Sequence, residues 1–213
     1  NSINWARLMA QVVYYFYAAS QLGAPHRKIA FSVPTGNFGD VFAGYVASKM
    51  GLPIERLIVA TNVNDILHRA LSAGDYSTGS VTPTAAPSMD IQVSSNFERL
   101  LFDLEGRDGA KTSARMADFE QSHNMQLEPG MRDTAASLFT SCRVDPDDMA
   151  LAMRWAQDKA GQIIDPHSAI GLSAAQQVDL DPAVPVVTLA TAHPAKFPDA
   201  VERATGIRPS LPR

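Results

Sequence analysis

The stretch Ser32-Val-Pro-Thr-Gly-Asn-Phe-Gly-Asp40 carries the strongest structural pattern in the chain. It follows an apolar run at 29–33, which predicts a buried strand, and precedes 41–50, which predicts a helix ending at Gly51. Glycine lets the backbone approach a ligand closely, and the free N–H groups at a helix start attract anions. The loop therefore predicts a phosphate site, although glycine turns without any ligand also occur. It matches neither the Walker pattern nor the three-glycine dinucleotide fingerprint.

Apolar runs alternate with helical patterns on both sides of this loop. Such alternation is typical of an α/β fold with an open, mostly parallel sheet and helices on both of its faces. The middle of the chain predicts short helices, after which strand and helix patterns resume. The predicted strands are 28–33, 57–60 and 184–189, and the predicted helices are 2–20, 39–50, 63–71, 95–105, 145–161, 165–178 and 198–205.

The strand ends predict where a ligand would bind. In an open parallel sheet, ligands lie outside the carboxyl ends of the strands. Loops 35–40, 61–65 and 190–197 all follow predicted strands, so we expect them to meet at one edge and to bind a phosphate-bearing cofactor. We expect three parts: an α/β cofactor-binding part with the phosphate loop at 1–72, a mainly helical insertion at 73–161, and a return to the sheet at 162–213.

Composition narrows the possible partners. The chain has 213 residues, of which 46% are hydrophobic and 19% charged, an ordinary globular balance. Its net charge of −4 has no basic runs, so no nucleic-acid partner is expected. The apolar region at 5–19 is interrupted by polar residues and is too short for a membrane span, so it predicts a buried helix. Cys142 is the single cysteine, which fits a reducing cytoplasm.

Other catalytic and metal patterns are missing. The five histidines have no metal-ligand spacing, and one cysteine cannot form a thiolate cluster, so no metal site is expected. Ser32 and Ser168 lack the Gly-x-Ser-x-Gly elbow of serine hydrolases. His193 could be a base, but a lone histidine before a proline is more typical of a hydrogen-bonded loop.

Several segments resemble one family. Thr35-Gly-Asn-Phe-Gly-Asp40 resembles the cofactor-phosphate loop of threonine synthases, which use pyridoxal 5′-phosphate (PLP) and have the fold type II architecture. The other segments follow in family order, and no such motif occurs between about 107 and 158. These segments are Asn1-Ser-Ile-Asn-Trp-Ala-Arg7, Ala60-Thr-Asn-Val-Asn-Asp65, Ser94-Ser-Asn-Phe-Glu-Arg-Leu100, Asp165-Pro-His-Ser-Ala-Ile-Gly171 and Ala190-Thr-Ala-His-Pro-Ala-Lys-Phe197.

The resemblance implies roles for the cofactor-binding residues. Gly36, Asn37, Phe38 and Gly39 would donate backbone N–H groups to the phosphate of PLP, with the Phe38 side chain serving as a packing residue. The hydroxyl of Thr191 would meet the pyridine nitrogen of PLP. The alternative for Thr191 is a hydroxyl that bonds to its own backbone.

The resemblance also implies a pocket for the phosphate of the substrate. Asn1, Ser2 and Arg7 open the first predicted helix, and a planar guanidinium suits a phosphate because it can donate two parallel hydrogen bonds. The alternative is that Ser2 is a helix cap and Arg7 an ordinary surface charge. The acidic Asp40 has the wrong sign for a phosphate neighbour, so we expect it to turn away from the anion.

The family also holds PLP on a lysine in a Ser-Phe-Lys-Asp type segment, and no such segment occurs here. We interpret the chain as an internal or carboxy-terminal portion of a larger enzyme, inactive alone, whose partner is the remainder of its own chain. The implied reaction converts O-phospho-L-homoserine and water into L-threonine and phosphate. The alternatives are another fold type II PLP lyase or deaminase, or a non-catalytic module that binds a phosphate ligand.

Overall fold

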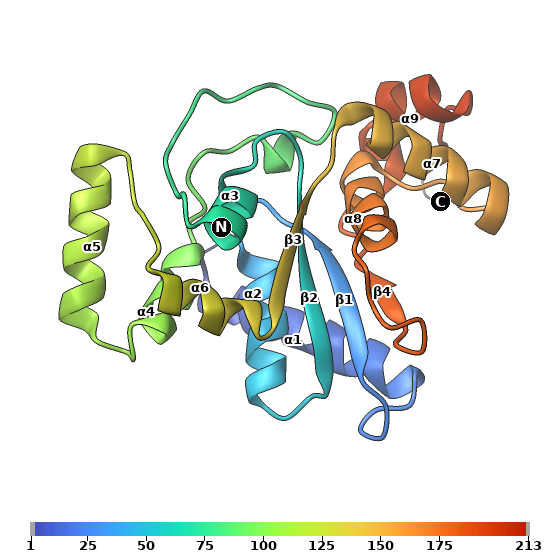
Figure 1. Ribbon diagram of the computed structural model, residues 1–213. Helices are drawn as coiled ribbons and strands as arrows, with labels where there is room; N and C mark the ends of the chain where they lie inside the picture. Colours follow the sequence, from blue (N-terminus) through green and yellow to red (C-terminus); the bar gives the residue numbers. More distant parts are fainter. Residues whose placement is uncertain (1–2, 212–213) are drawn as a thin grey trace.

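The computed structural model describes residues 3–211, so the predicted site residues Asn1 and Ser2 lie outside the described part. Helices and strands alternate around one sheet, as Figure 1 shows. In chain order the elements are α1 Trp5–Gln21, β1 Ile29–Pro34, α2 Gly39–Lys49, β2 Ile54–Thr61, α3 Ile66–Ala73, the short 3₁₀ helix η1 Pro87–Met89, α4 Phe97–Leu104, α5 Gly109–Ser122, α6 Pro129–Ala136, β3 Phe139–Arg143, α7 Pro146–Ala160, α8 Pro166–Gln177, β4 Val186–Thr188, η2 Pro194–Lys196 and α9 Pro198–Thr205.

The sheet is parallel, with strand order β3-β2-β1-β4. In the register, Phe31 of β1 lies opposite both Leu57 of β2 and Val187 of β4. Strand β1 is buried along its whole length, as expected for a central strand covered on both faces. The structure therefore confirms the predicted α/β fold with an open parallel sheet.

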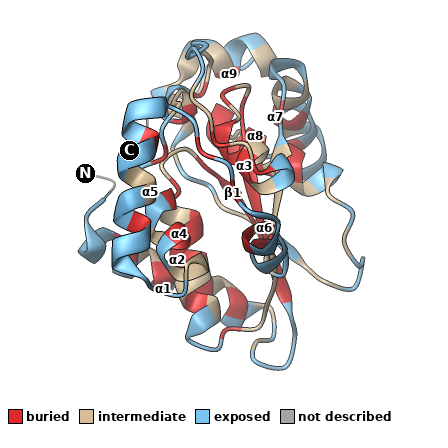
Figure 2. Cartoon of the chain, turned by 60° about the vertical axis from the view of Figure 1, so that its left-hand side comes forward, coloured by how far each residue is buried: buried red, intermediate tan, exposed pale blue. Residues whose placement is uncertain are grey.

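Helices cover both faces of the sheet, and alternate residues of β2 pack against the helices of opposite faces. Leu57 and Val59 of β2 belong to the main core, to which α1, α2, α3 and α6 also contribute. The alternate residues Ile58 and Ala60 pack with Ile170 of α8 in a second core cluster. This alternation follows from the two-residue period of a strand. Figure 2 shows the buried residues gathered around the sheet, whereas α5 is largely exposed.

Three local predictions were incomplete or wrong. Strand β3 was missed, because its segment Phe139–Arg143 is mostly polar and only Phe139 is buried at this edge of the sheet. It lies within the region 73–161, which is otherwise mainly helical, and the three-part division stays a prediction. Helix α1 is not buried all round as predicted, since Tyr14 and Tyr17 are exposed. Its N-cap is Asn4 and not Ser2, and the side chain of Asn4 accepts a hydrogen bond from the backbone N–H of Ala6 at 2.9 Å.

None of the helices in the described range 3–211 is both long and apolar enough to span a membrane.

Candidate cofactor-binding site

The loop between β1 and α2 has an unusual backbone. Phe38 adopts the left-handed conformation, with φ 60° and ψ 8°, which is uncommon for a residue with a side chain. Its ring is fully buried and packs at centroid distances of 5.3 Å from Phe97 and 5.8 Å from Phe139. The ring thus anchors the strained turn, and the prediction that Phe38 is a packing residue is confirmed.

Hydrogen bonds hold the carbonyl side of this loop. The hydroxyl of Ser94 donates to the carbonyl of Gly36 at 2.8 Å. The backbone N–H and side-chain amide of Asn96 donate to the carbonyl of Asn37 at 3.1 and 2.8 Å. Both carbonyls therefore face Ser94 and Asn96, in the segment before α4, and the peptide N–H groups of the loop do not take part in these contacts.

The N–H groups of the same loop form a site for an anion. Within the described part of the chain, the backbone N–H groups of Gly36, Asn37, Phe38 and Gly39 donate no hydrogen bond to another residue. Consecutive free N–H groups around a left-handed residue form an anion-binding concavity, and the N-terminus of α2 adds its dipole. The residues present therefore fit the phosphate group of a cofactor such as PLP.

Gly36 is required by close packing beneath the loop. A Cβ atom at this position would lie 2.5 Å from the carbonyl oxygen of Ser88, in η1, and 3.3 Å from the Cα atom of Met89. A backbone atom cannot move aside as the end of a side chain can, so any larger residue would displace η1 or the loop. The loop and η1 thus form one rigid floor.

Thr191 lies at the same edge of the sheet as this loop. It follows β4, which pairs with β1, so residues 35–39 and Thr191 extend from neighbouring parallel strands. Its backbone N–H donates to the hydroxyl oxygen of Ser168 at 3.3 Å. Among the residues that the structure describes, its own hydroxyl makes no hydrogen bond, so the alternative of a hydroxyl bonded to its own backbone is not observed.

The third predicted loop, after β2, is engaged with the rest of the chain. The side-chain amides of Asn62 and Asn64 donate to Asp90 at 2.7 and 3.1 Å, and Thr84 also donates to this carboxylate. This network fastens the 82–90 segment over the end of β2. The structure thus brings loop 61–65 to the predicted edge, where its polar side chains serve this network.

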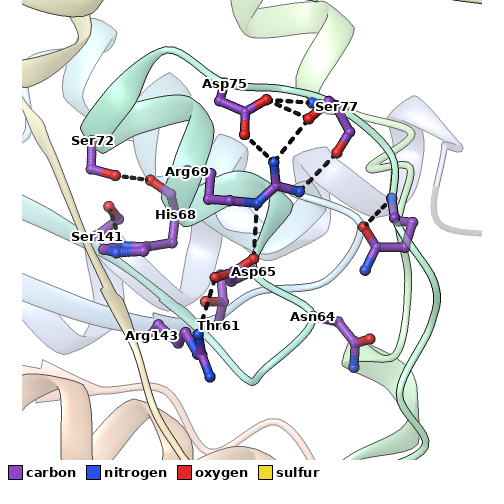
Figure 3. Close-up of polar contacts among 12 residues, drawn as sticks. Thr61, Asn64, Asp65, His68, Arg69, Ser72, Asp75, Ser77, Ser141 and Arg143 are labelled. Carbon is purple, nitrogen blue, oxygen red and sulfur yellow. Dashed lines mark hydrogen bonds and ion pairs between the residues drawn. The ribbon is translucent and has the colours of Figure 1, made fainter. Parts of the chain in front are cut away.

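Arg69 is the centre of a second polar network, as Figure 3 shows. Its guanidinium donates to Asp65 at 3.0 Å and to the carbonyl of Ser77 at 2.7 Å, and it also pairs with Asp75. Arg143 of β3 reaches Asp65 at 3.6 Å. One arginine therefore holds Asp75 and Ser77, at the start of the long loop that follows α3.

Arg7 and Asp40 lie where α1 approaches the N-terminus of α2. Arg7 is exposed on the first turns of α1. The Oδ1 atom of Asp40 is buried and has no hydrogen-bond partner within the described residues, while the Tyr15 hydroxyl donates to the backbone carbonyl of Asp40 at 2.8 Å. Burial raises the pKa of Asp40 to about 6, although the neighbouring Tyr15 and the charge of Arg7 lower it.

One buried polar cluster was missed by the sequence analysis. Asp165, His167 and Ser168, at the start of α8, are all buried, and the side chains of His167 and Ser168 are both hydrogen-bonded to Asp165. The sequence analysis predicted a helix over 165–178, and in the structure Asp165 is the N-cap of α8, where it accepts hydrogen bonds from the backbone N–H groups of His167 and Ser168. The further contacts of the ring with Ser88 and of the hydroxyl with Thr191 depend on distant segments, so no local pattern could reveal them.

Two further expectations concern histidines and metals. His193 accepts a hydrogen bond from the backbone N–H of Ala195 at 3.1 Å, as expected for a loop histidine. In residues 3–211, no group of three or more His, Cys, Asp or Glu side chains has an arrangement that could hold a metal ion.

Comparison with solved structures identifies the class. Maize serine racemase covers 85% of the chain at a TM-score of 0.55, and its 17% identity shows the fold alone. The crystal structure of PLP-bound threonine synthase from Brucella melitensis covers 100% of the chain at a TM-score of 0.96 and 54% identity. The chain therefore has the fold of the fold type II PLP enzymes.

Within that class, the relatives are threonine synthases. Residues 168–213 match the family model described as the C-terminal region of threonine synthase. Threonine synthase from Pseudomonas aeruginosa is 54% identical over 213 residues, which are 100% of this chain and 45% of that protein. The Brucella structure is likewise covered over 46% of its length. The chain is thus similar along its whole length to part of a threonine synthase, and it spans less than half the length of these relatives.

Proposed function

We propose that this chain is the part of a PLP-dependent threonine synthase that holds the cofactor phosphate and the pyridine nitrogen. The whole enzyme would convert O-phospho-L-homoserine and water into L-threonine and phosphate. One observation carries the proposal: the backbone N–H groups of residues 36–39 and the hydroxyl of Thr191, which make no hydrogen bond within residues 3–211, follow neighbouring parallel strands at one edge. The similarity to threonine synthases over the whole chain supports it.

The residues divide the work of holding the cofactor. Gly36, Asn37, Phe38 and Gly39 would bind the phosphate through their backbone N–H groups, and the ring of Phe38 would hold the loop in its binding conformation. The hydroxyl of Thr191 would bond to the pyridine nitrogen, where a neutral group favours the protonated ring less than a carboxylate does. When bound, PLP supplies an electron sink for negative charge on the substrate's carbon atoms.

The substrate's phosphate would be bound at the start of α1. Arg7 is exposed there, so its guanidinium can donate two parallel hydrogen bonds, and Asn1 and Ser2 precede α1 in the sequence, outside the described residues. Two separate phosphate sites would suit a reaction in which both cofactor and substrate carry a phosphate. This is the feature that favours a threonine synthase over a lyase or deaminase with a smaller substrate.

The remaining partner is the rest of the enzyme chain, which would supply the lysine that anchors PLP. The net charge of −4, which has no basic runs, supports the absence of nucleic-acid binding. The single cysteine supports a reducing cytoplasm.

The test uses the full-length enzyme that contains this chain, with phosphate release from O-phospho-L-homoserine as the assay. Arg7→Ala should lower kcat/KM by roughly ten-fold or more, mainly through KM, because a charge-assisted phosphate contact is lost. Arg27→Ala is the matched control, since Arg27 is an exposed arginine just before β1, at the amino ends of the strands and therefore away from the loops of the candidate site. An Arg7 variant with the kinetics of the Arg27 variant would show that Arg7 is only a surface charge, and an enzyme that forms no threonine would refute the proposal.

A further inference from the structure

We propose that Asp165, His167 and Ser168 form a positioning cluster that couples the phosphate loop to the loop carrying Thr191. The cluster would hold the two ends of the cofactor site at a fixed separation. The identity of the ligand rests on the proposed function, whereas the coupling rests on hydrogen bonds that the structure contains.

Asp165 is the hub of this cluster. Its carboxylate is fully buried and accepts four hydrogen bonds. The Nδ1–H group of His167 donates at 2.7 Å, the Ser168 hydroxyl donates to the other carboxylate oxygen, and the backbone N–H groups of both residues donate at 2.9 and 3.1 Å. Burial raises the pKa of Asp165, but these hydrogen bonds outweigh it and leave the pKa below its usual value. The carboxylate is therefore ionised at neutral pH and fully satisfied.

The first arm runs from His167 to the phosphate loop. Because Nδ1–H donates to Asp165, the Nε2 atom is free to accept, and it lies 3.3 Å from the backbone nitrogen of Ser88. The carbonyl of the same Ser88 is the atom against which Gly36 packs without room for a Cβ. His167 thus fixes the segment that forms the floor beneath the phosphate loop.

The second arm runs from Ser168 to Thr191. The hydroxyl of Ser168 donates its hydrogen bond to Asp165, so its lone pairs are available to accept a hydrogen bond from the backbone N–H of Thr191 at 3.3 Å. The His167 ring also packs against Phe197, at the far end of the same loop, with a centroid distance of 4.8 Å. The loop is therefore held at both ends by neighbouring residues of one helix.

An ordinary helix cap would explain only part of this arrangement. Asp165 caps α8 through two backbone N–H groups, and that role needs neither the imidazole of His167 nor the hydroxyl of Ser168. Both side chains are buried and reach segments 79 and 23 residues away. Substitutions at these two positions therefore separate positioning from capping.

The first experiment addresses the Thr191 arm in the full-length enzyme. Ser168→Ala should weaken PLP binding by about five-fold, the usual effect of one lost neutral hydrogen bond, and should change the pH dependence of the bound cofactor's absorption spectrum. Ser173→Ala is the matched control, because Ser173 is a buried serine of the same helix whose hydroxyl accepts a hydrogen bond from Gln177. The control should retain the spectrum and affinity of the unaltered enzyme.

The second experiment addresses the phosphate arm with two variants of His167. In His167→Asn the amide nitrogen can replace Nδ1 and keep the bond to Asp165, but nothing replaces Nε2. In His167→Gln the longer amide can accept from Ser88, while the bond to Asp165 is lost. The ³¹P resonance of bound PLP should shift more in the Asn variant than in the Gln variant, and the Asn variant should bind PLP about five-fold more weakly.

The outcomes separate this inference from the proposed function. An unaltered enzyme that binds no PLP would refute both. If the unaltered enzyme binds PLP, but the Ser168 and His167 variants match the Ser173 control in affinity, absorption spectrum and ³¹P resonance, only the positioning role is refuted. Melting temperatures measured for every variant show whether a change in affinity exceeds the effect of lost stability.

Discussion

Helices α1 and α8 are both rich in apolar residues, yet most of α8 is buried and most of α1 is not. Eight of the twelve residues of α8 are buried, but only four of the seventeen in α1 are. Helix α8 lies on one face of the sheet with α7 beside it, whereas α1 packs beside α2 on the opposite side (Figure 1). The difference shows that apolar content alone does not determine burial.

The side chains explain the contrast. Helix α8 carries small residues: a Cβ atom at Gly171 would lie 3.0 Å from Pro34 and Thr188, and the Gly171 carbonyl accepts a hydrogen bond from Ser32 at 2.6 Å. Helix α1 carries large residues on two faces. Tyr15 is fully buried on the inner face, while Tyr14 and Tyr17 are 59% and 68% exposed on the outer face.

The outer face of α1 is therefore a surface without a cover in the described part of the chain. Exposed apolar patches of this kind usually mark an interface. The relatives are about twice as long as this chain, so in the proposed full-length enzyme the remaining polypeptide is available to cover it. This face also accounts for the apolar pattern that predicted a buried helix.

The largest expected effect tests the inner face of α1. Tyr15→Ala removes a fully buried ring that packs 4.8 Å from Phe31 and donates a hydrogen bond to Asp40, so the free energy of unfolding should fall by about 3–5 kcal/mol. Tyr14→Ala, one position away on the outer face, should change it by less than about 0.5 kcal/mol. Urea unfolding of the 213-residue chain measures both, and equal losses would contradict the division of α1 into two faces.

A smaller effect concerns pH at the contact between α1 and α2. The pKa of Asp40 is about 6 in the folded chain and 3.8 in its ordinary state, so folding favours the protonated form. Its stabilising effect is complete below pH 3.8 and disappears as the pH rises through 6. Between these limits, the unfolding free energy of the unaltered chain should fall by about 1–3 kcal/mol relative to Asp40→Asn.

The matched control for this pH series is Asp118→Asn, because Asp118 is an exposed carboxylate on α5. Urea unfolding of the three proteins between pH 3.5 and 7.5 gives the comparison. A constant difference between the Asp40 variant and the unaltered chain across that range would show that Asp40 is hydrated in the folded state.

Local patterns predicted the parts of the fold that depend on neighbouring residues. The strand before the glycine loop, the helix after it and the proline-led helix α8 were all predicted, because burial on both faces and helix capping leave local signals. Strand β3 was not predicted, since an edge strand with one buried residue has no continuous apolar run.

The candidate site was predictable to the same extent. Loops 35–40 and 190–197 were placed at one edge from their positions after strands, whereas the roles of residues 36–39 and Thr191 came from the family resemblance and stay predictions. The Asp165 cluster depends on contacts with Ser88 and Thr191, far along the chain. The exposure of α1 could not be predicted either, because its sequence specifies two apolar faces without specifying what covers the second.

The smallest expected change in stability tests that second face. Val13 and Tyr17 lie one helical turn apart on the exposed side of α1, so Val13→Gln combined with Tyr17→Gln should change the unfolding free energy of the 213-residue chain by only about 0.5 kcal/mol. The double variant should nevertheless self-associate less, because a contiguous apolar surface becomes polar. Sedimentation velocity over a range of concentrations measures the association. In the full-length enzyme the same pair should cost more than 1 kcal/mol, because there the face would be buried against the remaining polypeptide. Equal, small effects in both proteins would show that the outer face of α1 stays exposed in the whole enzyme, and a large effect in the short chain would show that this face already packs within it.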